Sequence, residues 1–71
     1  MVRLNGTECI YQPRMSLVEL VNNYNADFHK TLAFDGFVVL INSIAITTSQ
    51  AHERILQDND NIFITPHLGG G

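Results

Sequence analysis

The sequence predicts an α+β domain in which one helix packs across a mixed β-sheet. Short segments rich in β-branched and aromatic residues occur near both ends of the chain. One segment between them has apolar residues at helical spacing. Residues that favour turns separate the strand-like segments.

The first two strands are expected to form a hairpin. Residues 2–4 alternate apolar and polar side chains, and Asn5 and Gly6 follow them. This dipeptide readily adopts the two positive φ angles of a type I′ turn. Residues 7–11 would form the returning strand, which ends before Pro13 because proline cannot donate a backbone hydrogen bond.

A helix is expected to begin after Ser16. Ser16 and Glu19 have the spacing of a capping box, and Met15 and Leu20 have the spacing of a hydrophobic staple. The helix should end near Asn25, since asparagine favours left-handed C-terminal positions. Its core-facing stripe is expected to comprise Leu17, Leu20, Val21 and Tyr24.

The second half of the chain is expected to contain three more strands. Residues 26–36 show no clear period, although Phe28, Leu32 and Phe34 could cover the edge of the core. The uninterrupted apolar run at residues 37–41 predicts the central strand, buried on both faces. Asn42 and Ser43 then offer a turn into a short strand at residues 44–46.

Residues 49–54 could form one helical turn, the cluster at residues 58–60 favours a turn, and residues 62–64 form the last strand. The resulting order β-β-α-β-β-β, with the helix folded across a mixed sheet, is the β-grasp arrangement. We therefore expect a single β-grasp domain over residues 1–71, with a flexible C-terminal tail at 67–71.

Composition excludes several classes of protein. The chain has 71 residues, of which 45% are hydrophobic and 15% charged, and it contains no apolar run near the ~20 residues of a membrane span. Its net charge is −3 and its four basic residues are dispersed, so no nucleic-acid partner is expected. The single cysteine, Cys9, excludes an internal disulfide, and no signal peptide is visible. We expect a reducing, cytosol-like compartment.

The sequence ends in Gly69-Gly70-Gly71 directly after the last predicted strand. A tail without side chains can enter a narrow channel in another protein, and its backbone is free to adopt any φ and ψ. We therefore expect the Gly71 carboxylate to be the reactive group. The alternative is a frayed end or a cloning remnant.

Five segments are informative in their order and spacing: residues 4–6, 16–21, 39–42 with Ile44, 56–60 before Ile62, and 69–71. Together they resemble the ThiS family of ubiquitin-like sulfur carriers of thiamine thiazole synthesis. The turns at Asn42-Ser43 and at residues 58–60 differ from the family pattern but keep turn-forming residues. Thr47-Thr48 stands where the family often has an arginine, which puts one partner contact in doubt.

The resemblance implies a protein cosubstrate and not an enzyme. An E1-like, ThiF-type adenylyltransferase would use ATP and Mg²⁺ to adenylate Gly71. A cysteine desulfurase or a rhodanese-type donor would convert the adenylate to a thiocarboxylate, and a ThiG-type thiazole synthase would take the sulfur. The free protein is expected to be a monomer in the cytoplasm, or in the plastid stroma if the gene is plastid-encoded.

Two alternatives remain. The chain could carry sulfur for molybdopterin or another pathway, or it could be a β-grasp interaction module or an isopeptide-linked modifier.

Possible partner contacts are Phe63, His67 and Leu68, with Gly69 and Gly70 entering the partner's channel. For Phe63, core packing is the competing interpretation.

Other reactive side chains are expected to have structural or solvent-exposed roles. Cys9 lacks a partnered base for catalysis. No histidine or cysteine pair has zinc-ligand spacing, so no metal is expected. Asp58 and Asp60 fit a turn better than a calcium loop, because no later ligand follows at the right position.

Overall fold

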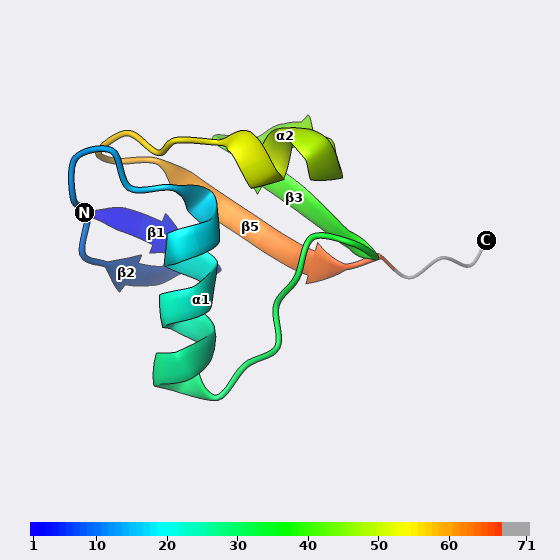
Figure 1. Ribbon diagram of the computed structural model, residues 1–71, viewed down its shortest axis with the longest axis horizontal. Helices are drawn as coiled ribbons and strands as arrows, with labels where there is room; N and C mark the ends of the chain where they lie inside the picture. Colours follow the sequence, from blue (N-terminus) through cyan, green and yellow to red (C-terminus); the bar gives the residue numbers. More distant parts are fainter. Residues whose placement is uncertain (68–71) are drawn as a thin grey trace.

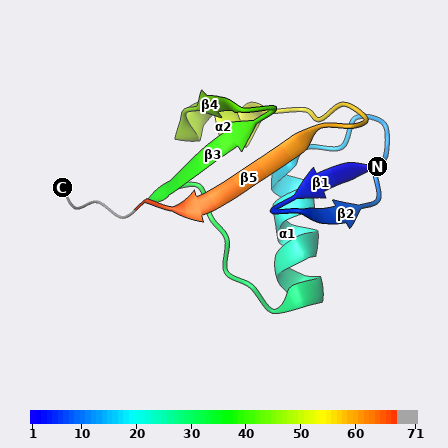
Figure 2. The same ribbon diagram turned by 180° about the vertical axis from the view of Figure 1, so that it is seen from behind.

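A computed structural model describes residues 1–67 of the chain, which form a five-stranded mixed sheet with two helices on one face (Figure 1). Seen from behind, the sheet lies in front of both helices (Figure 2). The elements are β1 Val2–Leu4, β2 Thr7–Cys9, α1 Leu17–Phe28, β3 Phe37–Ile41, β4 Ile44–Ile46, α2 Thr48–Glu53 and β5 Asn61–Pro66. This is the predicted α+β, β-grasp fold. Apart from His67, the tail predicted to be flexible lies outside the described residues.

The strand order is β2-β1-β5-β3-β4, so β5 is the central strand. It runs parallel to β1 and antiparallel to β3. The prediction that residues 37–41 form the central strand, buried on both faces, is therefore wrong. Both helices cover the same face, so alternate side chains of β3 point away from them, and Val38 remains 36% exposed.

Both hairpins use left-handed turn residues. Asn5 and Gly6 have φ angles of 51° and 83°, which confirms the predicted type I′ turn. Asn42 and Ser43 have φ angles of 50° and 70° and form the corresponding turn between β3 and β4. Strand β2 ends at Cys9, earlier than predicted.

Helix α1 begins where the sequence predicts. The Ser16 side chain accepts a hydrogen bond from the Glu19 amide at 3.0 Å, while its hydroxyl donates to the Glu19 carboxylate at 3.4 Å. The helix continues past the predicted end to Phe28, with His29 as the left-handed cap at φ 54°. Asn25 lies within the helix, and its side chain bonds both backbone groups of Leu32, each at 2.9 Å.

Helix α2 is displaced by one residue from the predicted turn at 49–54. Thr47 caps it and forms a complete capping box with Gln50. Thr47 thus has a structural role as the helix cap. Strand β5 also extends beyond the predicted residues 62–64 at both ends. Within residues 1–67, neither helix has the length and apolarity needed to cross a membrane.

The core lies between the sheet and the helices. Its α1 residues match the predicted stripe, with Tyr24 only partly buried. Phe28 is 48% exposed and packs on the Tyr24 ring, with centroids 5.0 Å apart, so its predicted place over the core is wrong. Met15 and Leu20, the predicted staple, are both buried. The buried residues are Val2, Leu4, Met15, Leu17, Leu20, Val21, Phe34, Val39, Ile41, Ala51, Leu56, Ile62 and Ile64.

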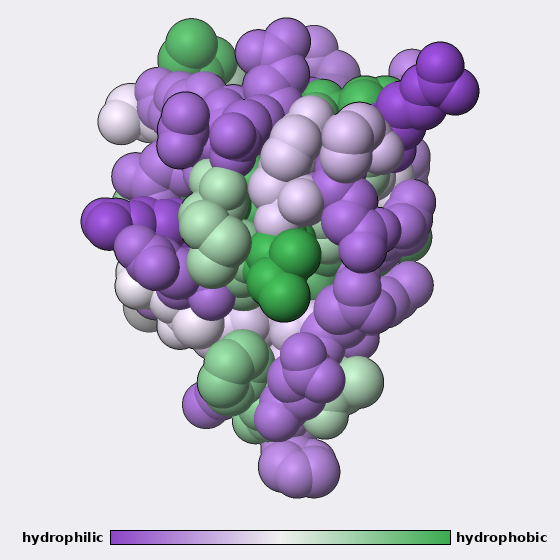
Figure 3. All heavy atoms as spheres, turned by 90° about the vertical axis from the view of Figure 1, so that its left-hand side faces the viewer, coloured by the Kyte–Doolittle hydropathy of each residue, from purple (hydrophilic) through white to green (hydrophobic). Residues whose placement is uncertain are grey.

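Some hydrophobic side chains stay at the surface. Ile10, which follows β2, is 71% exposed. On the side of the molecule where β1 and β2 lie, a small group of hydrophobic atoms is surrounded by mainly hydrophilic ones (Figure 3).

Candidate functional site

The candidate site is the C-terminal end of β5 and the sheet surface beside it. Strand β5 pairs with β3 along its whole length, from Ile41↔Ile62 to Phe37↔Pro66. On its other side it pairs with β1 only at Arg3↔Asn61 and Leu4↔Ile62. The second half of β5 therefore lies beyond the end of β1 and needs another partner on that side.

The side chain of Asn5 supplies this partner. Its Nδ2 donates to the Ile64 carbonyl at 3.0 Å, and its Oδ1 accepts from the Ile64 amide at 2.8 Å. The side-chain amide thereby imitates the backbone of a strand residue, since it has both a donor and an acceptor. Asn5 thus shapes the β1–β2 turn and also holds β5. The sequence pattern predicted only the role of Asn5 in the turn.

One further bond fixes the backbone beyond Pro66. The His67 amide donates to the Gly36 carbonyl at 2.8 Å and so extends the β3–β5 ladder. Gly36 has a φ of 78°, which glycine adopts without strain. His67 itself is exposed, as expected for a residue after the last strand. Leu68, Gly69, Gly70 and Gly71, the other residues predicted for the tail, lie outside the described residues.

An apolar patch lies on the sheet face opposite the helices. We define the outer-face patch as Val38, Leu40, Ala45, Phe63 and Thr65, which strand register places together: Leu40 pairs with both Phe63 and Ala45, and Val38 pairs with Thr65. Phe63 is 42% exposed and lies outside the buried core. Core packing, the competing interpretation for this residue, is therefore wrong.

The remainder of this face is polar. Arg3 and Glu8 form an ion pair at 3.3 Å across β1 and β2, and Asn61 lies beside Arg3. The apolar patch therefore occupies only the β5–β3–β4 side of the face, adjoining the end of β5. An exposed apolar patch with polar surroundings is typical of a protein contact surface.

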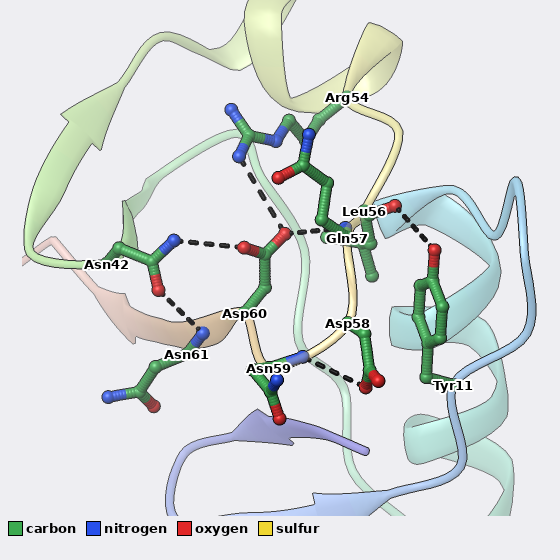
Figure 4. A network of polar contacts seen from close by, with 9 residues as sticks. All are labelled: Tyr11, Asn42, Arg54, Leu56, Gln57, Asp58, Asn59, Asp60 and Asn61. Carbon is green, nitrogen blue, oxygen red and sulfur yellow. Dashed lines mark hydrogen bonds and ion pairs between the residues drawn. The ribbon is translucent and has the colours of Figure 1, made fainter.

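A polar network holds the opposite end of β5 (Figure 4). Asp60 is only 5% exposed. Its carboxylate accepts from Asn42 Nδ2 at 2.9 Å and from the Gln57 amide at 2.8 Å, and the Arg54 guanidinium lies 3.8 Å away. Asn42 Oδ1 also accepts from the Asn61 amide at 2.9 Å. The network joins the β3–β4 turn and the end of α2 to the start of β5.

These contacts give Asp58 and Asp60 structural roles. The Asp58 carboxylate accepts from the amino group of Met1 and from the Asn59 amide. The hydrogen bond from the Met1 ammonium is the main cause that lowers the pKa of Asp58. Residues 1–67 contain no cluster of three histidine, cysteine or acidic side chains that could hold a metal ion. The hydrogen bonds of the two carboxylates to backbone and side-chain groups in and around the turn before β5 make both aspartates turn residues, as the sequence predicts.

Cys9 is a partly buried residue at the sheet edge. Burial raises the pKa of its thiol, and the nearby charge of Asp27 raises it further, although a backbone hydrogen bond acts in the opposite direction. A raised pKa reduces the thiolate fraction at neutral pH, and the thiolate is the nucleophile. Cys9 thus lacks the environment of a reactive cysteine, which agrees with a structural role.

No protein-family model matches the sequence, and no curated protein matches it. The site must therefore be judged on its geometry. The structure places Phe63 within β5 on the outer face and the His67 backbone just beyond the end of the same strand. It adds Asn5, Gly36, Val38 and Leu40, which sequence analysis did not assign to the site. Their roles depend on strand pairing between distant segments, which local sequence patterns do not reveal.

Proposed function

We propose that the protein is a ThiS-type sulfur carrier whose C-terminal glycine is the site of chemistry. One observation carries the proposal: the central strand of a β-grasp fold leads directly into the glycine-rich sequence. That strand is held up to His67 by Asn5 and Gly36. The outer-face patch, which includes Phe63, offers a protein partner an apolar contact surface next to the same strand end.

The chemistry follows from the properties of a carboxylate. With a pKa near ~3.5, an α-carboxyl group is an anion at neutral pH and resists nucleophilic attack. A ThiF-type enzyme would join the Gly71 carboxylate to AMP, using ATP and Mg²⁺ and releasing pyrophosphate. Hydrosulfide would displace AMP and give the thiocarboxylate directly. A persulfide would displace AMP to give an acyl disulfide, which a thiol would then reduce to the thiocarboxylate. A ThiG-type thiazole synthase would consume the thiocarboxylate.

Glycine suits this exchange because it leaves the carbonyl carbon open to the incoming sulfur. Gly69 and Gly70 would let the backbone lie close to the walls of a partner's channel. The protein would be consumed and regenerated as a cosubstrate, without binding a cofactor of its own. The proposal locates it in the cytoplasm, or in the plastid stroma for a plastid gene.

The test is the intact mass of the native protein after incubation with ATP, Mg²⁺, sulfide and a ThiF-type enzyme from the same organism. The mass before incubation establishes whether the mature chain ends at Gly71. We expect an ATP-dependent exchange of one oxygen for one sulfur, localised to Gly71. A Gly71→Val variant should not react, and a Glu53→Gln variant, changed at an exposed residue of α2 with an unaltered tail, serves as the control.

Other outcomes separate the alternatives. Absence of both adenylate and thiocarboxylate, with an enzyme that is active on its own carrier, would contradict the proposal. Species of higher mass linked through lysine would indicate an isopeptide-linked modifier. Transfer of sulfur to a molybdopterin precursor, but not to thiazole synthase, would assign the carrier to the other pathway.

A further inference from the structure

A groove lies between the edge strand β2 and helix α1, separate from the outer-face patch. It has a volume of about 540 Å³ and is lined by residues of both elements and of the segment that joins them. Two exposed apolar side chains belong to its lining, Ile10 at 71% and Phe28 at 48% exposure. Figure 3 views the molecule from the side on which β2 lies. We call this feature the β2–α1 groove.

The backbone along one side of this groove is free to bind another strand. Strand β2 is an edge strand with β1 as its only neighbour among residues 1–67. Arg3 lies opposite Glu8, yet its amide donates to the Asp60 carbonyl at 3.0 Å, away from β2. Arg3 and Glu8 are therefore a non-hydrogen-bonded pair, so the backbone N–H and C=O of Glu8 point out of the sheet.

Ile10 extends the same open edge. It lies two residues beyond Glu8, and its backbone groups make no hydrogen bond within the described part of the chain. Unpaired backbone groups along a sheet edge are a template for an added strand. Binding of an extended peptide to such an edge is a recurrent mode of protein recognition.

The charges around the groove favour one kind of peptide. Three acidic residues, Glu8, Glu19 and Asp27, belong to its lining, and no lysine or arginine does. Glu8 is paired with Arg3, and Glu19 accepts a hydrogen bond from the Ser16 hydroxyl. Asp27 has no ion-pair partner among residues 1–67, and its charge acts on the Cys9 thiol. A bound segment with basic side chains would therefore meet uncompensated negative charge.

We propose that the β2–α1 groove binds an extended segment of a partner protein that carries lysine or arginine among apolar residues. The segment adds to the free edge of β2 as a strand. Its apolar side chains contact Ile10 and Phe28, while its basic side chains approach Asp27 and Glu19. This surface is distinct from the C-terminal end of β5, and the inference does not depend on sulfur transfer.

The probe is an acetylated and amidated heptapeptide of valine with lysine at positions 2 and 5, so that each face of the added strand carries both residue types, titrated into the ¹⁵N-labelled protein. We expect the largest amide shifts at Glu8, Ile10 and Asp27, and weaker binding as salt is raised. A peptide with glutamate in place of lysine should bind at least about tenfold more weakly, a difference of about 1.4 kcal/mol. N-methylation of the valines, which removes backbone donors, should have an effect of similar size.

Two variants of equal net charge test the role of Asp27. Asp27→Lys should weaken the lysine–valine peptide by about tenfold, and Asp35→Lys, at an exposed acid outside the groove, by no more than about twofold. Both variants are first checked for a native amide spectrum. Each of four results would overturn the proposal. The two variants could have equal effects, or the glutamate peptide could bind as tightly as the lysine–valine peptide. The amide shifts could centre on Phe63, or no binding could occur at millimolar peptide.

Discussion

The inner and outer faces of strand β5 differ sharply although they alternate residue by residue. Ile62 and Ile64 point into the core and are 0% and 1% exposed, whereas Phe63 between them is 42% exposed. All three are apolar, so hydrophobicity does not distinguish them. Core stability and surface recognition can therefore be altered separately within one strand, because successive side chains point to opposite faces.

Replacing an inner-face residue should have the largest effect on stability. Ile62→Ala removes a fully buried side chain and should lower the free energy of unfolding by about 2 to 5 kcal/mol. Urea denaturation followed by circular dichroism measures the loss. Phe63→Ala is the matched outer-face control. Similar losses for the two variants would mean that the two faces are not energetically distinct.

The hydrogen bonds of Asn5 should have the next largest effect. Asn5→Gly keeps the favourable backbone conformation at φ 51° but removes both bonds to Ile64, and should cost about 1 to 3 kcal/mol. Hydrogen exchange should become faster at the Ile64 amide, relative to the Ile62 amide. Asn5→Ala should cost more, because alanine adds strain at the positive φ. An unchanged exchange rate at Ile64 would contradict the proposed support of β5.

Phe63→Ala should separate stability from partner binding. Because the side chain is partly exposed and outside the core, we expect a loss of only about 1 kcal/mol. Under the proposed function, the KM for adenylation by the ThiF-type enzyme should rise by about tenfold, while kcat changes little. Thr65→Ser, a smaller change on the same patch, is the control. An unchanged KM would exclude Phe63 from the contact surface.

The smallest expected effect is that of Asp58 on acid stability. The Met1 ammonium lowers the pKa of Asp58 in the folded state, so the unfolded state binds the proton more readily. The stabilisation is therefore present above the ordinary pKa of about 3.9 and is lost as the pH falls through the lower folded value. Asp58→Asn should slightly reduce the dependence of the free energy of unfolding on pH in that acidic range and leave this dependence at neutral pH unchanged. Urea denaturation midpoints of both proteins, measured across the acidic range, test this prediction.

Local patterns predicted the elements and the β-grasp arrangement, but not which strand lies at the centre of the sheet. Asn5-Gly6 and Ser16 marked a turn and a helix start because their backbone preferences act over a few residues. Thr47 and Gln50 carried an equally local capping-box signal that sequence analysis overlooked. The burial of residues 37–41 could not be predicted from the apolar run alone, since it depends on which sheet face the helices cover.

The candidate site was only partly predictable for the same reason. Phe63 was identified as a possible contact, but its exposure depends on the face that β5 presents. The support from Asn5 joins residues 59 positions apart, and no local pattern encodes that pairing. At the end of α1, Asn25 has the residue type expected for a cap, but His29 takes the left-handed position and the Asn25 side chain bonds Leu32.

The position of β5 between β1 and β3 makes completion of the sheet depend on the last strand. Without β5, the β1–β2 and β3–β4 hairpins have no hydrogen-bonded neighbour in common. Pairing of Arg3 with Asn61 closes nearly the whole chain into a loop, which costs conformational entropy before the contacts form. A nascent chain that stops before residue 61 therefore leaves the inner face of the sheet incomplete and open to chaperones or proteases. Completion of the fold thus reports that the strand leading to the glycine-rich sequence has been synthesised.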